Sequence, residues 1–265
     1  MLKRLIPETS VYIGSDLSLA TGTAAIKTIV ETDILPWIES FNNISFIESE
    51  NNYFYYNIGS NAIIMFLYWD NIDNAASSFG RLKIGLCRKD SKNIIVEFFI
   101  KGSHLTTISN GYVVPNFELH ALADKENNLT ALYTSGDFTL PASNCNYIFF
   151  DIDETGKKYI GFKKDTDSRE IFYLDDKRVI QHFYSTGKTI NNNKALSYFN
   201  ENYIIMEKVQ IFNSLSSQFT SLSTNMVRII NQALNTDKET NFTVIEVDGD
   251  KYRKLEYDIW IKDND

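Results

Sequence analysis

Residues 146–184 read NYIFFDIDETGKKYIGFKKDTDSREIFYLDDKRVIQHFY, and this stretch decides the fold class. Short runs of aromatic and β-branched residues alternate in it with tight polar turns, which is the pattern of consecutive strands. Strands that follow one another with such short connections pair antiparallel in a β-meander. The stretch therefore predicts four strands, at residues 146–153, 157–163, 170–174 and 178–184.

Hairpin patterns continue on both sides of this meander. Residues 44–49 and 53–58 flank Glu50-Asn51-Asn52, and asparagine tolerates the left-handed conformation that a hairpin turn needs. Residues 62–69 are apolar on both faces for most of their length, as expected of a central strand. Further strands are predicted at residues 82–88, 93–101, 112–122, 129–134 and 203–212, and a terminal hairpin at 243–247 and 252–257.

One N-terminal segment, residues 21–41, has the period of a helix. Pro36 should kink this helix or restart it, because proline has no amide hydrogen to donate. A helix this apolar packs on the sheet that follows or on another subunit, and its interface candidates are Ile26, Ile29, Val30 and Trp37. Residues 214–234 fit either a second helix or a pair of strands.

These elements predict an α+β fold that is mainly antiparallel β, built of meanders and hairpins. It has one N-terminal amphipathic helix, and a C-terminal helix if residues 214–234 are helical. A chain of 265 residues holds one large domain or two smaller ones. Residues 135–144, with Gly136 and Pro141, mark the expected seam between regions 1–134 and 145–265, unless the two form one continuous domain.

The charge and hydropathy of the chain argue against several classes of partner. The net charge is -8, the acidic residues are scattered, and no run of lysine or arginine occurs, so we expect no nucleic-acid partner. An anionic membrane surface is disfavoured for the same reason. No segment has the pattern of a signal peptide or of a transmembrane helix, which predicts synthesis in the cytoplasm.

The motif FFDIDETG at residues 149–156 invites a catalytic interpretation. Its spacing resembles the nucleophile motif of haloacid-dehalogenase-type phosphotransferases, in which Asp151 would attack phosphorus and Asp153 would act as acid and base. That site needs a strand, a loop and then a helix, whereas residues 157–163 again have the pattern of a strand. A hairpin explains the motif, so a phosphotransferase is the least favoured function.

We therefore expect no catalytic residue, no cofactor and no metal site in this chain. The acidic turns Asp165-Thr166-Asp167 and Asp248-Gly249-Asp250 carry oxygens of the kind that calcium accepts, but neither extends into a loop with a distal glutamate. Solvated turns between strands are the better explanation of both.

Aromatic side chains offer a different kind of site. Alternation along the strand places Tyr53 and Tyr55 on one face, and together with Trp69 they are candidates for a surface on which sugars stack. Exposed aromatic residues mark protein interfaces at least as often. A carbohydrate- or cell-surface-binding β module, with a glycan as partner, is therefore the alternative function.

Two segments resemble structural proteins of tailed phages and of phage-tail-like bacteriocins. Residues 240–263, TNFTVIEVDGDKYRKLEYDIWIKD, look like the hairpin that ends such chains. Residues 53–69, YFYYNIGSNAIIMFLYW, which follow a helix, resemble their N-terminal part. The resemblance implies a non-enzymatic neck, tail or baseplate protein, made in the host cytoplasm and incorporated into a virion or tail particle. Its partners would be other copies of itself and other proteins of that particle.

Overall fold

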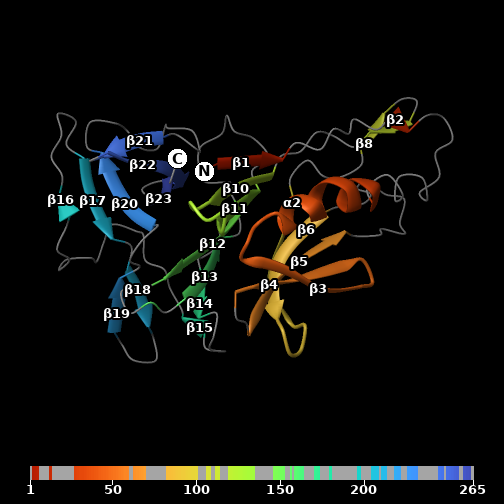
Figure 1. The fold of residues 1–265 in the computed structure, drawn as a ribbon, viewed down its shortest axis with the longest axis horizontal. Helices are drawn as coiled ribbons and strands as arrows, with labels where there is room; N and C mark the ends of the chain where they lie inside the picture. Colours follow the sequence, from red (N-terminus) through yellow and green to blue (C-terminus); the bar gives the residue numbers. More distant parts are fainter. Residues whose placement is uncertain are drawn as a thin grey trace.

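The computed structural model describes residues 2–5, 12–13, 27–59, 62–69, 82–100, 106–108, 111–113, 119–134, 146–152, 156, 158–163, 170–173, 179–180, 196–197, 204–208, 210–213, 218–221, 226–231, 244–247, 249–256 and 259–263. Most of these residues lie in antiparallel strands, and one helix of 13 residues lies near the N-terminus (Figure 1). The predicted fold class, α+β and mainly antiparallel β, is confirmed.

The predicted meander forms one half of a seven-stranded antiparallel sheet. In spatial order, its strands are β1 (Leu2–Leu5), β10 (Leu119–Ala123), β11 (Leu129–Thr134), β12 (Asn146–Ile152), β13 (Lys158–Lys163), β14 (Glu170–Tyr173) and β15 (Val179–Ile180). The four meander strands are β12 to β15, and each pairs with the next. On either side of the expected seam at 135–144, β11 pairs with β12, so one sheet includes both sides of that seam.

The hairpins of the N-terminal region form a five-stranded sheet whose strands follow chain order. They are β3 (Ile44–Glu50), β4 (Tyr53–Ile58), β5 (Ile63–Trp69), β6 (Leu82–Arg88) and β7 (Ile94–Phe99). Asn51 and Asn52 have φ angles of 50° and 66°, so the turn between β3 and β4 uses the left-handed conformations that its asparagines predict. The central strand is β5, and it is buried along nearly its whole length, as predicted.

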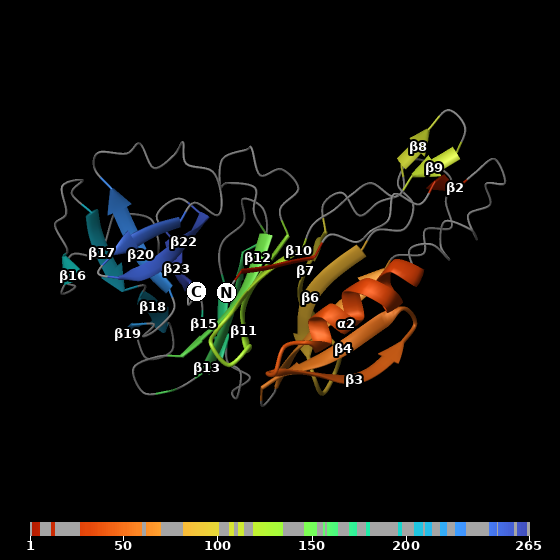
Figure 2. The same ribbon diagram turned by 45° about the horizontal axis from the view of Figure 1, so that its top comes forward.

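The helix lies against one face of the five-stranded sheet (Figure 2) and shares an apolar core with the seven-stranded sheet. Residues 27–39 are helical, and they comprise α-helical residues 27–29, a π-helical turn η1 (Val30–Ile34) and the α-helix α2 (Leu35–Glu39). The π-turn ends at Ile34 and α2 begins at Leu35, so Pro36 lies in the first turn of α2, where its missing N–H costs no helical hydrogen bond. Residues 21–26 of the predicted helix lie outside the described residues.

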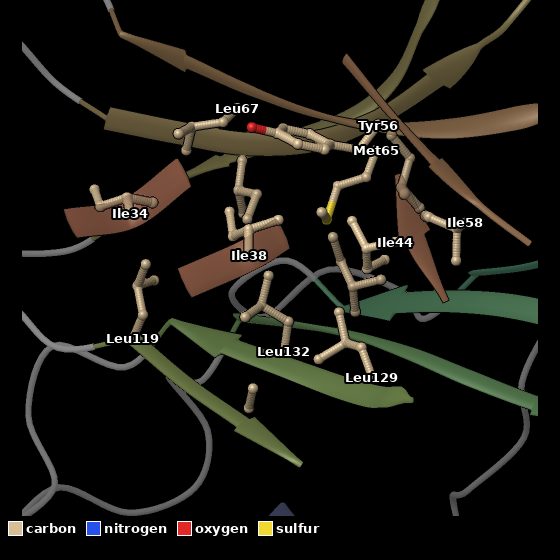
Figure 3. Close-up of a cluster of buried hydrophobic side chains, with 14 of the residues drawn as sticks. Ile34, Ile38, Ile44, Tyr56, Ile58, Met65, Leu67, Leu119, Leu129 and Leu132 are labelled. Carbon is tan, nitrogen blue, oxygen red and sulfur yellow. The ribbon is translucent and has the colours of Figure 1, made fainter. Parts of the chain in front are cut away.

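One apolar core joins the helix to both sheets. Ile34 and Ile38 of the helix point toward the same interior as Met65 of the five-stranded sheet and Leu132 of the seven-stranded sheet (Figure 3). All four side chains are almost completely buried. Burying apolar surface on three elements at once stabilises their mutual arrangement, since each element covers a face that the others would expose.

Asparagines fix the end of the helix to the turn between β10 and β11. The main-chain N–H of Asn42 donates to the carbonyl oxygen of Asn127 at 3.1 Å. The side-chain amide of Asn127 donates in return to the carbonyl oxygen of Ser40 at 2.6 Å, and Lys3 of β1 donates to Asn127 Oδ1. Asn127 adopts a φ of 62°, a left-handed conformation that asparagine tolerates better than most residues.

The C-terminal part of the chain adds a six-stranded sheet and a two-stranded sheet, and segments of the N-terminal part form a three-stranded sheet. The six strands, in spatial order, are β16 (Leu196–Ser197), β17 (Ile204–Lys208), β20 (Met226–Asn231), β23 (Ile259–Asp263), β22 (Asp250–Glu256) and β21 (Val244–Val247). The smaller sheets are β18 (Gln210–Asn213) with β19 (Gln218–Ser221), and β2 (Tyr12–Ile13) with β9 (Gly111–Val113) and β8 (Thr106–Ile108).

Several predicted elements are corrected by this arrangement. The single strand expected at 112–122 is divided between β9 and β10, which belong to different sheets, and that expected at 203–212 is divided between β17 and β18. Within 214–234 the described residues form β19 and β20, so the strand alternative is the correct one there. The terminal hairpin is β21 with β22, and a further strand, β23, follows it.

Candidate interaction surface

The five-stranded sheet has a second packed face, on the side away from the core that it shares with the helix. We call this the outer face. The pairing register aligns its side chains in two rows across β4 to β7, which are Tyr53, Tyr68, Lys83 and Phe99, and Tyr55, Phe66, Gly85 and Glu97. Strand alternation places both rows on the same side of the sheet. The outer face therefore collects aromatic and charged side chains from four strands.

Three tyrosines of the outer face stack on one another, and we call them the tyrosine ladder. The ring of Tyr53 lies between Tyr55, at a centroid distance of 5.8 Å, and Tyr68, at 4.0 Å. The two ring planes are within 9° and 21° of that of Tyr53. The ammonium of Lys92 lies 4.0 Å from the centroid of Tyr55, and that of Lys83 lies 5.6 Å from Tyr68. Aromatic rings and cation–π contacts thus cover ring faces along the whole ladder.

The charges beside the ladder are paired within the chain. Lys83 lies 2.9 Å from a carboxylate oxygen of Glu97, and Lys92 lies 2.5 Å from one of Glu48. The ammonium of Lys83 also lies 4.9 Å from the ring centroid of Phe99. Because these lysines already have acidic partners, this part of the outer face presents no excess positive charge to an anionic ligand.

A glycine on the outer face, Gly85, makes room for the ring of Phe66. Gly85 lies opposite Phe66 in the register, and the Phe66 ring occupies the space where a Cβ of residue 85 would be. Such a Cβ would be 2.6 Å from Phe66 Cζ and 2.3 Å from the carbonyl oxygen of Val96. An aromatic ring over a glycine is a known way to protect a strand that would otherwise be weakened.

Burial favours the neutral forms of one thiol and two phenols of this sheet. Burial raises the pKa of the Cys87 thiol to about 11, and the nearby Lys92 opposes that effect. Burial is also the main cause that raises the pKa of Tyr55, with Cys87 adding to it. The pKa of Tyr56, on the core side, is raised by burial and by Glu39. At neutral pH the thiol and both phenols are therefore protonated, and none of them is an activated nucleophile.

The proposed sugar-stacking residues do not form one platform. Tyr53 and Tyr55 share the outer face, but Trp69 is 4% exposed and belongs to the core on the opposite side of the sheet. Trp69 directly follows Tyr68 in β5, and strand alternation sends neighbouring side chains to opposite faces. Tyr68 takes the place expected of Trp69. The signal that could have identified Tyr68 is the hairpin register of β4 with β5, in which Tyr53 lies opposite Tyr68.

The helix residues expected at a subunit interface are placed differently from one another. Ile29 and Val30 are 1% and 0% exposed and lie in the core of their own chain. Trp37 is half-buried, and its ring makes an edge-to-face contact with Phe41 at 5.5 Å. Ile26 lies outside the described residues. Of the two possibilities open for the helix, packing on the chain's own sheets is the one observed.

Exposed hydrophobic side chains gather on the edge strands. Among the described residues, the large hydrophobic side chains that are exposed are Phe46 (48%), Ile94 (47%), Phe99 (40%) and Val244 (41%). Phe46 lies on β3, Ile94 and Phe99 lie on β7, and Val244 lies on β21. Each of these strands is the outermost strand of its sheet. Exposed apolar side chains on edge strands are typical of surfaces that pair with another chain.

The two edges of the five-stranded sheet differ in charge, and both are interrupted by a bulge. In β3 the register shifts between Phe46 and Glu48, which marks a β-bulge, and the strand also carries Glu50. Bulges and charges are the usual means by which proteins prevent further strands from adding to an edge. In β7 the only charged residue is Glu97, and its carboxylate is already paired with Lys83. The register of β6 with β7 shifts as well, because Leu86 lies opposite Val96 and Cys87 lies opposite Ile94, which leaves Ile95 as an extra residue in β7. Both edges therefore contain a bulge.

The residues of the phosphotransferase hypothesis lie in a hairpin. Asp151 is in β12, directly opposite Tyr159 of the antiparallel strand β13, whereas Asp153 lies outside the described residues. The strand that follows is antiparallel, so the strand–loop–helix unit of that family does not occur at this point. Within the described ranges, no group of three or more His, Cys, Asp or Glu side chains is arranged to hold a metal ion.

No helix within the described residues has both the length and the apolar character needed to cross a membrane. No protein family matches this sequence, and no curated protein is similar enough to count as a relative. Any functional assignment therefore depends on the geometry of the chain itself.

Proposed function

We propose that this chain is a non-enzymatic structural subunit of a multi-subunit particle, and that it joins its neighbours at the edges of its sheets. The observation that carries the proposal is the placement of the exposed hydrophobic side chains on β3, β7 and β21. A neighbouring strand at such an edge forms main-chain hydrogen bonds and covers the apolar side chains beside them. Subunits that associate in this way need no catalytic group.

The proposed subunit contacts lie at the sheet edges rather than on the helix. Ile29 and Val30 are covered by their own chain, so they have no surface left to offer another subunit. The sheet edges remain, and they carry the exposed apolar side chains that a neighbouring subunit can cover. The proposal therefore assigns subunit contacts to the edges.

The kind of particle is proposed from the resemblance of residues 53–69 and 240–263 to structural proteins of phage tails and tail-like bacteriocins. Those residues include β4, β5 and the hairpin of β21 with β22, on which the exposed Val244 lies. A neck, tail or baseplate position would supply both identical and different neighbours. We expect the protein in such a particle together with further copies of itself.

Sedimentation of a lysate from the source cells tests the proposal directly. The fractions of a density gradient are blotted for this protein and examined by electron microscopy. We expect the protein to migrate with large particles. Migration only at the position of a 30.5 kDa monomer would contradict a structural role.

Edge variants then test where the contacts lie. The substitutions Phe46→Ser, Phe99→Ser and Val244→Ser each remove an exposed apolar side chain from one edge strand. The matched control is Lys125→Ser, which changes an exposed side chain in the turn between β10 and β11. We expect at least one edge variant to be lost from particles while the control is retained. Equal retention of all four variants would contradict assembly through these edges.

The alternative functions predict different results. A glycan that stacks on the ladder would compete with Lys92 at the ring of Tyr55 and with Lys83 at the ring of Tyr68. Binding on a glycan panel that is lost in Tyr68→Ala would favour a carbohydrate-binding module. Magnesium-dependent turnover of a phosphoester that is lost in Asp151→Asn would favour the phosphotransferase.

A further inference from the structure

We infer that β1 is a detachable strand of the seven-stranded sheet, and that Lys3 controls its release. Separation of β1 uncovers the N–H and C=O groups along the side of β10 that β1 occupies, where another strand can then add. This opening is an equilibrium within one chain, so it does not depend on the proposed assembly.

The strand β1 lies at one end of the sheet. Among the described residues it pairs with β10 alone, with Lys3 opposite Ala121 and Leu5 opposite Leu119. Ala121 and Leu119 belong to the apolar core, and opposite residues of a strand pair lie on the same face. Lys3 and Leu5 therefore point toward the core side of the sheet, and both side chains are half-buried.

The ammonium of Lys3 has two partners on this side. It donates a hydrogen bond to Oδ1 of Asn127, in the turn between β10 and β11, and it lies 4.9 Å from the ring centroid of Phe41. Both contacts compensate the ammonium for the water that it loses when β1 is in place. When β1 separates, the ammonium becomes hydrated again, whereas an apolar side chain there would be exposed to water. A lysine at this position therefore fixes the attached state through specific contacts and keeps the free-energy cost of separation low.

The turn beside Lys3 is also held by hydrogen bonds that do not involve β1. The carbonyl oxygen of Asn127 accepts from the main-chain N–H of Asn42 at 3.1 Å, and the Asn127 side-chain amide donates to the carbonyl oxygen of Ser40 at 2.6 Å. Asn42 Nδ2 donates to the carbonyl oxygen of Glu126 at 2.5 Å. On its other side β10 pairs with β11. The turn and β10 can therefore keep their places when β1 leaves, which makes the opening local.

The test is hydrogen exchange, measured by mass spectrometry on the whole chain and followed in the segments that contain β10, β5 and β12. It compares Lys3→Glu with Lys125→Glu, and each substitution reverses one charge. In Lys3→Glu the new carboxylate meets Asn127 Oδ1 and the face of the Phe41 ring, both of which repel an anion. Lys125 is exposed and lies in the same turn as Asn127, so its reversal is the matched control.

We expect the β10 amides that face β1 to exchange at least about tenfold faster in Lys3→Glu, because a hydrogen bond from a charged donor is lost. Exchange in β5 and β12 should not change, and Lys125→Glu should behave as the unchanged protein. Unaltered exchange of β10 in Lys3→Glu would overturn the role of Lys3. Equal acceleration in all three segments would show that β1 leaves only when the whole chain unfolds, and it would overturn the inference as well.

The unchanged protein provides a second measurement, which applies even if Lys3→Glu does not fold. In urea below the unfolding transition, the β10 amides that face β1 should exchange before those of β5, because they need only the local opening. A common exchange rate for both segments would contradict a separate release of β1.

Discussion

The side-chain amide of Asn43 pairs with the main chain of Leu129 in the way that a neighbouring strand would. The N–H of Leu129 donates to Asn43 Oδ1 at 2.7 Å, and Asn43 Nδ2 donates to the carbonyl oxygen of Leu129 at 2.9 Å. Asn43 directly precedes β3, and Leu129 is the first residue of β11. One side chain therefore joins the start of the five-stranded sheet to the seven-stranded sheet.

Replacing Asn43 should weaken the whole fold. Asn43→Ala leaves the N–H and C=O of Leu129 without these partners in a site shielded from water, and we expect a loss of about 1–3 kcal/mol in the free energy of unfolding. The measurement is equilibrium unfolding in urea. Asn93→Ala, at an exposed position in the turn before β7, should change stability by no more than about 0.5 kcal/mol. Equal effects of the two substitutions would contradict a structural role for the Asn43 amide.

The substitution Gly161→Ala should reduce stability, and a second substitution at Phe149 should recover part of the loss. A Cβ at this position would be 2.2 Å from Cε1 and Cζ of Phe149, which lies opposite in the register. We expect Gly161→Ala to cost about 1–3 kcal/mol, since overpacking forces side chains out of their preferred positions. Adding Phe149→Leu should recover part of this loss, so that the two effects are not additive in urea unfolding. Simple additivity would show that the ring is not the obstacle.

Gly85 should behave differently under the same treatment. Its nearest obstacle is the main-chain oxygen of Val96, at 2.3 Å, followed by the Phe66 ring. Gly85→Ala should therefore destabilise the protein by at least as much as Gly161→Ala, about 1–3 kcal/mol or more. Adding Phe66→Leu should not restore stability, because the clash with the main-chain carbonyl oxygen of Val96 remains when the ring is removed. Recovery in that double variant would mean that the strand can shift to accept the methyl group.

The buried thiol of Cys87 predicts a pH dependence of stability. Its pKa is about 11 in the folded protein against 9.0 for the unperturbed thiol. Between these values the folded state keeps the proton and the unfolded state loses it, so rising pH favours unfolding. Stability in urea should fall between about pH 9 and pH 11, and it should fall less in Cys87→Ala. Tyr55 and Tyr56 titrate in both proteins, so identical slopes would exclude Cys87 as a cause.

Lys92 should contribute through its charge rather than through its hydrocarbon stem. The ammonium lies over the ring of Tyr55 and beside Glu48. Lys92→Met keeps the length of the side chain but removes both attractions, and we expect a loss of about 0.5–1 kcal/mol, measured by thermal unfolding. Lys125→Met, in an exposed turn, is the control and should have little effect. A neutral result for Lys92→Met would show that the ladder does not depend on its terminal cation.

Local patterns in the sequence predicted local pairing well. Asn51 and Asn52 specified a turn in which both residues are left-handed, and the strands β6 and β11 have the bounds that alternation and turn residues indicated. Both features depend on the conformational preferences of residues that are adjacent in the sequence. The meander was predictable for the same reason.

Assignments that depend on distant parts of the chain were less predictable. The expected strand at 112–122 crosses from one sheet to another, and Pro115, which cannot donate to a ladder, is the one residue that signals the break. Trp69 was expected beside Tyr53 and Tyr55 but lies in the core, because the face of a strand that meets the core depends on the elements packed against it. The edge position of β7 likewise depends on the arrangement of all five strands.

The bulge in β3 limits how far a sheet made from many copies of this chain can grow. A strand interrupted between Phe46 and Glu48 cannot continue a regular hydrogen-bonded ladder beyond the sheet of its own chain. Adding protein should then raise the number of small complexes and leave their length unchanged. We expect concentrated solutions to stay fluid and free of fibres, whereas deleting both Ile47 and Ile95, the extra residues of β3 and β7, should make them viscous.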